Sequence, residues 1–241
     1  MTLIDLPSPN FDARPVNGPI DILLLHYTGM QSAEEAVARL RDPAARVSSH
    51  YVVDEDGSVL RLVAEDQRAW HAGISYWNGI REINARSIGI EIVNPGHEWG
   101  YRPFPAAQMQ SVIGLSQQII AQHGIPAARV LGHSDVAPLR KQDPGELFDW
   151  RALAAQGVGL WPEPQPVSWD EATFLTALNR YGYDIDGAAS TAPETAHHAA
   201  ILAFERHFRP QRLSGRADAE LAAILNGLLA AAGIDRAGLG A

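Results

Sequence analysis

The sequence predicts an α/β domain followed by a small domain of three helices. Two strongly apolar runs, at residues 21–27 and 87–93, have the length and composition of buried strands. Apolar residues also recur at helical spacing, and after a proline-rich stretch this helical periodicity is the only one present. We therefore divide the chain into an α/β domain at 1–161, a stiff linker at 162–167 and a three-helix domain at 168–241.

Capping residues, turn residues and periodicity predict the individual elements. Ser32 and Glu35 form a capping box that begins a helix, and Asp56 followed by Gly57 is typical of a hairpin turn. In chain order we expect an irregular arm at 1–19, a helix at 32–41, hairpin strands at 48–53 and 58–63, a long loop at 64–86, a helix at 105–122, a strand at 129–132, a short helix at 149–157, and capped helices at 168–182, 191–208 and 217–232.

Composition and charge exclude several classes of protein. The chain has 241 residues, a net charge of −9 and no cysteine, so we expect no nucleic-acid partner, no disulfide and no thiolate zinc site. No apolar run approaches the roughly 20 residues of a membrane helix. The first ten residues lack the basic and apolar regions of a signal peptide. We therefore expect a cytoplasmic monomer, with the periplasm or the cell envelope as the alternative location.

The segment at residues 131–145 gathers chemically active side chains after a short apolar approach. His133, Asp135, Lys141 and Asp143 stand within eleven residues. Two prolines and a glycine exclude a regular helix here, and loops at strand ends commonly carry functional sites. His133 and Asp143 can both reach one divalent metal. The spacing alone is a weak signal, because a solvated surface loop accounts for it equally well.

One further candidate ends the first apolar strand and another interrupts the second. His26 lies at the C-terminal end of its strand, where ligands of open α/β sheets collect, although a structural role is also compatible with a single histidine. Glu91 stands between isoleucines, and strand alternation places it on the face opposite to them. A carboxylate there is costly to bury unless it is paired or faces a cleft, so we favour a functional role.

Together these residues predict a catalytic metal centre. His26, His133 and Asp143 are three zinc ligands that leave a fourth position for water. Zinc lowers the pKa of bound water to about 7, Glu91 can take its proton, and Lys141 can face the developing oxyanion. The reaction favoured by this set of residues is hydrolysis of an amide or an ester.

Five short motifs stand in order between about residues 15 and 157. They are Leu-Leu-His26-Tyr-Thr, Ser-His50-Tyr, Arg68-Ala-Trp-His71-Ala-Gly, Asn84-x-x-Ser-Ile-Gly-Ile-Glu91 and Gly-His133-Ser-Asp…Arg-Lys141-x-Asp143-Pro-Gly. This part of the chain resembles the zinc-dependent N-acetylmuramoyl-L-alanine amidases of the peptidoglycan-recognition-protein superfamily. The resemblance is specific, because the motifs keep their order and contain every candidate named above.

The resemblance implies a mixed central β-sheet flanked by helices and cleavage between N-acetylmuramic acid, or its 1,6-anhydro form, and L-alanine of peptidoglycan or muropeptides. The alternative is a muropeptide-recognition protein without hydrolysis, but such relatives typically lack a zinc ligand. The implied roles are zinc as cofactor on His26, His133 and Asp143, Glu91 as catalytic base, Lys141 beside the tetrahedral intermediate, and His71 and Asn84 as substrate contacts.

Residues 168–232 resemble the three-helix peptidoglycan-binding module. The similar segments are Tyr181-Gly-Tyr-Asp-Ile-Asp-Gly187 and Ala200-Ile-Leu-Ala-Phe-Glu205-Arg-His-Phe-Arg-Pro, with Glu205 where the module usually has glutamine. We expect this unit to recruit polymeric substrate, because a capped unit behind a stiff linker is typical of a portable module. The alternative is that it packs on the first domain and shapes its cleft. Intact sacculus and soluble anhydromuropeptide both remain candidate substrates.

Overall fold

The apolar run near the N-terminus forms β3 (Ile22–Tyr27), an interior strand of the sheet in the computed structural model, which describes residues 3–186 and 192–236. On one side β3 pairs in parallel with β7 (Ser87–Ile92), and on the other with β8 (Val130–Gly132). Strands in such positions are covered on both faces, which accounts for their nearly continuous apolar sequence. The sheet is mixed, with the strand order β1-β5-β4-β7-β3-β8, and the predicted fold class is confirmed.

The predicted hairpin joins the edge of the sheet to its centre. Its strands are β4 (Tyr51–Val53) and β5 (Val59–Arg61), which pair antiparallel. Gly57 in the turn has φ 87°, a conformation that favours glycine. β4 also pairs in parallel with β7, so the hairpin is anchored to the central strands.

Two regions expected to be irregular contain short elements. In the arm at 1–19, β1 (Leu3–Asp5) pairs in parallel with β5, and β2 (Phe11–Ala13) pairs antiparallel with β6. The loop at 64–86 contains β6 (Gln67–Ala69) and the helical turn α2 (Ile83–Arg86). The sequence prediction is wrong in these places, because a strand of three residues is too short to show alternation and exists only through pairing with a distant segment.

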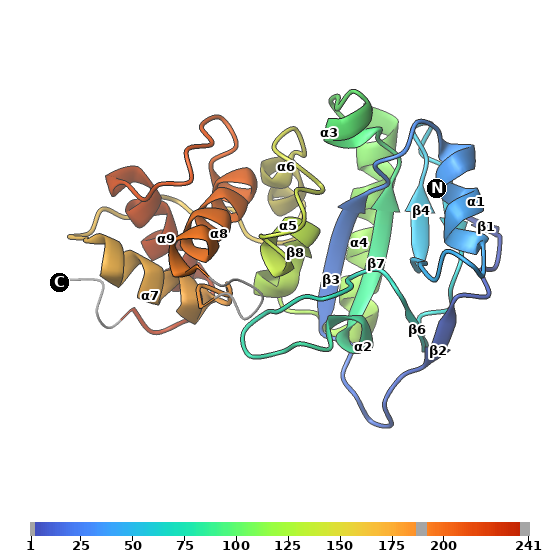
Figure 1. The fold of residues 1–241 in the computed structure, drawn as a ribbon, viewed down its shortest axis with the longest axis horizontal. Helices are drawn as coiled ribbons and strands as arrows, with labels where there is room; N and C mark the ends of the chain where they lie inside the picture. The colour runs from blue at the N-terminus through green and yellow to red at the C-terminus, as the bar shows by residue number, and fades with distance from the viewer. Residues whose placement is uncertain (1–2, 187–191, 237–241) are drawn as a thin grey trace.

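Helix α4 (Ala106–His123) covers one face of the sheet (Figure 1). The isoleucines of β7 all point to this face, which confirms the predicted alternation. α6 (Trp150–Ala155) adds to the same cluster, and α1 (Ala33–Arg41) packs through Leu40 with Val52 and Val93 in a separate one. The cluster under α4 includes Leu23, Leu25, Ile88, Ile90, Ile92, Val112, Leu115, Ile119, Trp150 and Leu153.

The other face of β3 is divided along its length. Ile22 and Leu24 belong to a large apolar cluster, whereas His26, further along the same face, is a buried polar residue. The apolar part is covered by the C-terminal helices and by the helical turn α5 (His133–Val136). The remaining short turns are α3 (Gly96–Trp99) and the 3-10 turn η1 (Ala127–Arg129).

Within the described residues, the C-terminal part contains three helices, α7 (Glu171–Tyr181), α8 (Pro193–Phe208) and α9 (Ala219–Ala231). The N-cap of α7 is Asp170, two residues beyond the expected Ser168. The predicted start of the second helix at Thr191 lies outside the described residues. None of the helices in the described ranges is both long and apolar enough to cross a membrane.

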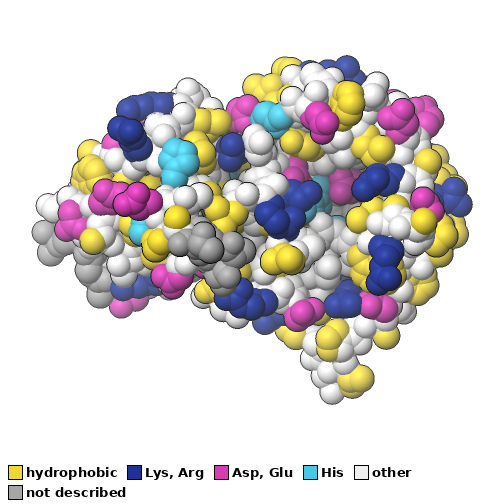
Figure 2. All heavy atoms as spheres, in the orientation of Figure 1, with side chains coloured by type: hydrophobic (Ala, Val, Ile, Leu, Met, Phe, Trp, Pro, Cys, Tyr) yellow, Lys and Arg dark blue, Asp and Glu magenta, His cyan; other side chains and the backbone are white. Residues whose placement is uncertain are grey.

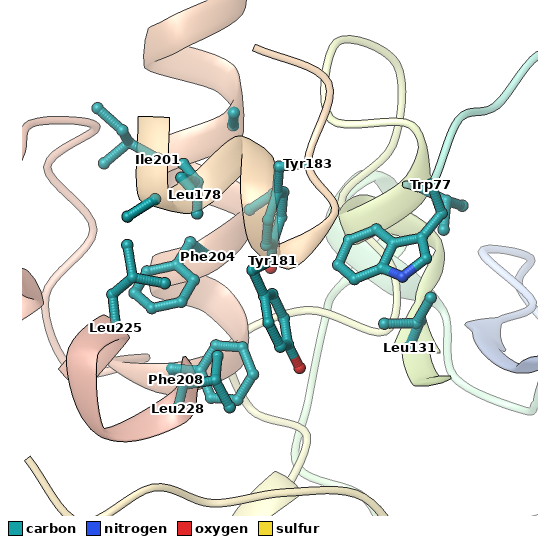
Figure 3. Close-up of a cluster of buried hydrophobic side chains, with 14 of the residues drawn as sticks. Trp77, Leu131, Leu178, Tyr181, Tyr183, Ile201, Phe204, Phe208, Leu225 and Leu228 are labelled. Carbon is teal, nitrogen blue, oxygen red and sulfur yellow. The ribbon is translucent and has the colours of Figure 1, made fainter. Parts of the chain in front are cut away.

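The C-terminal helices share one hydrophobic core with the sheet. Figure 3 shows Trp77 and Leu131 facing Tyr181 and Tyr183 of the C-terminal part. The Trp77 ring lies 5.5 Å from that of Tyr181 and 5.0 Å from that of Tyr183, and the Asn78 amide donates to the Gly182 carbonyl at 2.9 Å. The side chains of Trp77, Leu131, Tyr181 and Tyr183 are all nearly fully buried. The C-terminal helices therefore pack as part of the first domain's core.

Residues 162–167, predicted as a stiff linker, contain no helix or strand and do not span open solvent. The Gln165 amide donates to the Ala223 carbonyl at 2.8 Å, and the Asn226 side chain donates to the Gln165 carbonyl at 3.1 Å. The linker therefore lies along α9 and adds to the contact between the two parts. This arrangement favours the expectation that the helices pack on the first domain over that of a portable module.

A chain ending at Gly159 is expected to be insoluble or to melt at a much lower temperature than the full chain. Shortening uncovers Trp77, Leu131 and Val136, and exposing one such side chain costs about 1.5–3 kcal/mol. The cost of exposing all three side chains approaches the free energy of unfolding of a typical domain, which is roughly 5–15 kcal/mol. Thermal unfolding followed by circular dichroism measures the difference. Equal melting temperatures for the two chains would show that the first domain folds independently.

Candidate metal centre and active site

Three side chains meet at the C-terminal edge of the central strands. His26 is the fifth residue of β3, His133 directly follows β8, and Asp143 lies beyond α5. Because β3 and β8 are parallel neighbours, their C-terminal ends lie at the same edge. His26 Nδ1 is 2.9 Å from His133 Nδ1 and 3.1 Å from Asp143 Oδ2, and the last two atoms are 3.0 Å apart.

Hydrogen bonds to the backbone hold His133 and Asp143 in place. His133 Nε2 donates to the Ala72 carbonyl at 3.0 Å. A neutral imidazole carries one N–H, so His133 Nδ1 keeps a free lone pair directed at the other two side chains. The Asp143 carbonyl accepts from the Ser134 amide at 2.9 Å, which closes the loop between the two residues.

The donor set fits a single divalent cation. Two imidazole nitrogens and one carboxylate oxygen are the ligands that zinc takes at catalytic sites, where a fourth position stays open. Among the residues that the structure describes, His26, His133 and Asp143 form the group of His and acidic side chains close enough to share an ion. The structure thus brings together the three residues that the sequence predicts as zinc ligands.

The protonation of these groups also suits a metal. Burial, and then the neighbouring His133, lower the pKa of His26 to about 4, so its ring is neutral at physiological pH. Burial by itself raises the pKa of Asp143, but His133 and His26 outweigh it and hold that pKa well below its usual value. The buried, ionised carboxylate of Asp143 is a negative charge that attracts a cation.

A cavity of about 360 Å³ opens beside the three residues. Its size is that of a pocket for a small organic ligand. Figure 2 shows this face of the molecule hollowed, with Lys and Arg side chains around the hollow. The lining includes Glu91, Lys141, His133 and Asp143, and also Trp70 and Arg140 from the quoted motifs. Sequence reasoning missed Arg39, His97 and Glu98, because they come from segments without a motif of their own.

Glu91 projects from β7 on the same face as His26. The two residues are direct partners in the register between β3 and β7. Glu91 Oε2 is buried and has no hydrogen-bond partner within the described part of the chain. Burial, reinforced by the charge of Asp143, raises the pKa of Glu91 well above its usual value, while Lys141 opposes the shift. An unpaired carboxylate with a raised pKa beside a metal site is typical of a proton acceptor.

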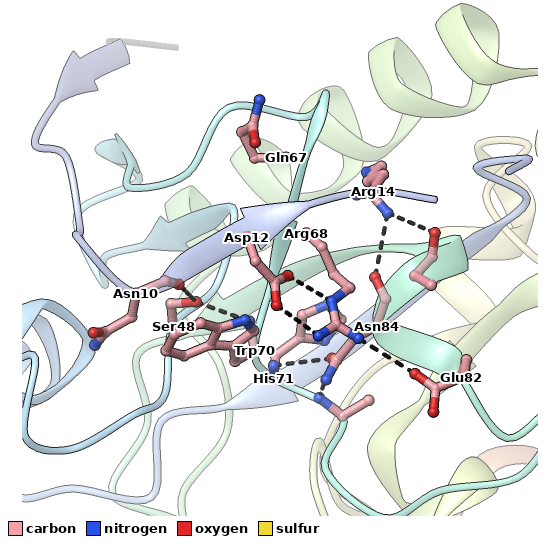
Figure 4. Close-up of polar contacts among 12 residues, drawn as sticks. Asn10, Asp12, Arg14, Ser48, Gln67, Arg68, Trp70, His71, Glu82 and Asn84 are labelled. Atoms are coloured by element: carbon pink, nitrogen blue, oxygen red, sulfur yellow. Dashed lines mark hydrogen bonds and ion pairs between the residues drawn. The ribbon is translucent and has the colours of Figure 1, made fainter. Parts of the chain in front are cut away.

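The structure gives His71 and Asn84 partners within the protein. Asn84 Oδ1 accepts from the amides of His71 and Ala72 at 3.1 and 2.8 Å (Figure 4). His71 is 9% exposed, with Nδ1 3.0 Å from His26 Nε2 and Nε2 3.3 Å from Ser87 Oγ. His71 lines the cavity, and the role of these two residues as substrate contacts stays a prediction. Asn84 fixes the backbone of the loop, and His71 contacts a candidate metal ligand.

Asp135 belongs to the same segment as His133 but has a different environment. Its Oδ2 accepts from the Gly132 amide at 2.7 Å and from His207 Nδ1 at 2.8 Å, and its Oδ1 accepts from the Tyr183 hydroxyl at 2.6 Å. Asp135 is fully buried. It therefore connects the C-terminal helices to the loop that carries His133. No sequence signal identifies this link, because its partners lie 48 and 72 residues away.

Comparison with known proteins places these observations in a family. The family model described as N-acetylmuramoyl-L-alanine amidase matches residues 16–146. The N-acetylmuramoyl-L-alanine amidase AmiD of Escherichia coli is 39% identical over 239 residues, which cover 90% of this chain and 84% of AmiD. The 1,6-anhydro-N-acetylmuramyl-L-alanine amidase AmpD of the same species is 32% identical over 162 residues, which cover 60% of this chain and 86% of AmpD.

Two solved structures are similar over most of the chain. The complex of E. coli AmiD with anhydro-N-acetylmuramic acid-L-Ala-D-gamma-Glu-L-Lys has a TM-score of 0.79 at 39% identity and covers 92% of each chain. AmpDh3 from Pseudomonas aeruginosa, in complex with anhydromuramic pentapeptide, has a TM-score of 0.79 at 28% identity and covers 94% of this chain and 98% of that one. Coverage of this extent includes the C-terminal helices as well as the sheet.

The purified protein is expected to contain about one zinc ion per chain, and His133→Ala is expected to lose it. The change removes one of three ligands and also the donor to the Ala72 carbonyl. Elemental analysis by mass spectrometry measures the metal. His123→Ala is the control, because His123 bonds Glu65 at the end of α4 and should leave the metal content unchanged. Full zinc content in His133→Ala would contradict the assignment.

Glu91→Gln is expected to make the metal-free protein more stable at pH 8. The pKa of Glu91 is raised on folding, so its ionisation destabilises the folded state. This loss is complete above the folded pKa, shrinks as pH falls below it, and is absent below the unfolded pKa. The gain in melting temperature should therefore shrink at lower pH. Thermal unfolding in the presence of a chelator measures it at each pH. A variant less stable than the parent at pH 8 would show that the carboxylate is favourably paired.

Proposed function

The chain belongs to the N-acetylmuramoyl-L-alanine amidase family, and we propose that it is a zinc hydrolase that acts on muropeptides. The bond cleaved is the amide between N-acetylmuramic acid, or its 1,6-anhydro form, and L-alanine. The observation that carries the proposal is the group of three metal ligands next to the unpaired carboxylate of Glu91, all lining or bordering one cavity. A protein that only binds muropeptides has no use for a proton acceptor beside a metal site, so hydrolysis is favoured over recognition alone.

The three ligands and Glu91 have complementary tasks. When bound to His26, His133 and Asp143, zinc supplies a Lewis acid that lowers the pKa of water at the site to about 7. Glu91 Oε2, which has no other partner in the described residues, accepts the proton of the attacking water. The raised pKa makes Glu91 a stronger base than an exposed carboxylate, and Glu91 then returns the proton to the amide nitrogen as the bond breaks.

Lys141 stabilises the charge that develops on the carbonyl oxygen. Its side chain lines the cavity together with Glu91 and Asp143, and it stands two residues before a metal ligand in a loop held by backbone hydrogen bonds. A fixed ammonium group in a site shielded from water lowers the energy of the tetrahedral state more than that of the substrate, which carries no charge at this oxygen.

The cavity suits a substrate with negatively charged groups on a peptide. Arg39, Arg140 and Lys141 line it, and the stem peptide of a muropeptide carries carboxylates. The relatives whose structures hold anhydromuropeptides support this substrate class. Soluble anhydromuropeptide is therefore the substrate that we propose first.

The C-terminal helices are proposed to support the active-site loop. Arg206 of α8 donates to the Gln142 side chain at 3.4 Å, and Gln142 lines the cavity. His207 of the same helix donates to Asp135, which belongs to the turn that carries His133. Because these contacts support the active-site loop itself, the helices affect the rate of hydrolysis of small and polymeric substrates alike. A module that only recruits polymer would affect the polymeric substrate alone.

Wild-type protein is expected to release free stem peptide from anhydro-N-acetylmuramyl tripeptide, and Glu91→Gln is expected to reduce the rate by about 10²–10⁴-fold. Mass spectrometry of the products identifies the bond that is cleaved, and elemental analysis should find the zinc content of the variant unchanged. Glu55→Gln is the control, since Glu55 pairs with Arg102 at the hairpin turn. Binding of the substrate by the wild type without release of peptide would contradict hydrolysis. A rate for Glu91→Gln within a few-fold of the wild type would exclude Glu91 as the base.

A further inference from the structure

His71 lies against β7 at a position that requires glycine on the strand. A Cβ added at Gly89 would lie 2.6 Å from both Cγ and Nδ1 of the His71 ring, closer than carbon atoms approach without a shift of the structure. The backbone of His71 is held as well, because its amide donates to Asn84 Oδ1. The ring meets that of His26 edge to face, with the centroids 5.1 Å apart. His71 is therefore fixed on three sides in front of a metal ligand.

The hydrogen bonds around His71 have one consistent direction. Ser87 Oγ lies 2.7 Å from the Ile83 carbonyl, which can only accept, so the hydroxyl proton of Ser87 points there. Ser87 Oγ then accepts from His71 Nε2 at 3.3 Å. With its proton on Nε2, a neutral His71 ring has an accepting Nδ1. His26 Nε2, 3.0 Å from that atom, must be the donor.

This direction decides which nitrogen of His26 keeps a lone pair. With the proton on Nε2, the neutral ring of His26 has a bare Nδ1, and this is the atom that faces His133 Nδ1 and Asp143 Oδ2. In a neutral His133 ring Nδ1 is bare as well, because Nε2 donates to the Ala72 carbonyl. Three acceptors then face one another without a proton between them, which costs free energy unless a cation lies among them.

We propose that His71 is a positioning residue of the metal centre, which together with Ser87 holds His26 in the tautomer whose Nδ1 binds zinc. The identity of the metal rests on the proposed function, whereas the hydrogen-bond chain does not. Ligand histidines commonly donate their second N–H to a protein acceptor, which orients the ring and increases its basicity. In this protein the acceptor is a second histidine, itself oriented by Ser87.

Zinc affinity of the purified protein, measured by competition with a chromophoric chelator, tests the role of the acceptor. His71→Leu keeps an apolar side chain in the slot but removes the acceptor, and we expect zinc to bind about 10–100-fold more weakly. His71→Asn can place its Oδ1 near the position of the imidazole Nδ1, so we expect affinity within a few-fold of the wild type. His123→Leu, a histidine replacement far from the site, is the control and should bind zinc as the wild type does.

The tautomers can be observed directly in the wild-type protein. Long-range ¹H–¹⁵N correlation spectra of zinc-loaded protein distinguish a protonated ring nitrogen from one with a lone pair. We expect a proton on Nε2 and none on Nδ1 in both His71 and His26. The opposite tautomer in His71 would overturn the proposal, even if the leucine variant failed to fold.

The two measurements separate positioning from packing. Equal zinc affinity in His71→Leu and the wild type would overturn the proposal, and so would equal losses in His71→Leu and His71→Asn, since packing rather than the acceptor would then be responsible. Melting temperatures of the metal-free variants show whether the fold has changed. Failure of the wild type to hydrolyse muropeptide would contradict the proposed function but would leave the affinity and tautomer results intact.

Discussion

The parallel pairing of β3 with β7 and β8 is the constraint on which the site depends. Parallel neighbours end at the same edge of the sheet, so the pairing brings His26, Glu91 and His133 together from three separate parts of the chain. A shift of one residue in the register would turn His26 or Glu91 to the face covered by α4. The apolar residues packed beneath α4 prevent such a shift, because it would also expose them. The same packing thus stabilises the fold and keeps His26, Glu91 and His133 at one edge of the sheet.

The two faces of β3 and β7 serve different purposes. One face is apolar throughout, and the other changes from apolar to polar along the strands, at the point where the covering helices give way to the cavity. The polar part includes a carboxylate without a hydrogen-bond partner in the described residues, which is unfavourable for stability. Proteins commonly accept such local destabilisation at functional sites.

The C-terminal helices pack against the sheet on the side of β8. They cover the apolar part of the second face, and Asp135 accepts hydrogen bonds from Tyr183 and His207 while it also accepts from the backbone of the ligand-bearing turn. A buried carboxylate with three donors is stable only while all of them are present. These contacts join the C-terminal helices, which resemble a separate module in sequence, to the turn that carries His133. The segment between the predicted boundaries at 161 and 168 lies along α9.

Local sequence determined the long elements and the chemical candidates. Continuous apolar runs, capping residues and glycine turns are signals contained within a few residues, so the central strands, the hairpin and α4 could be predicted, and the motifs identified the amidase family and its activity. The cytoplasmic location stays a prediction of the sequence. Only the tertiary structure decided the rest: the short strands β1, β2 and β6, the role of Asn84 in fixing a loop, the contact of His71 with a candidate metal ligand and the shared core. These features arise from pairings between residues far apart in the chain, and no local pattern records which distant group will satisfy a buried donor or acceptor.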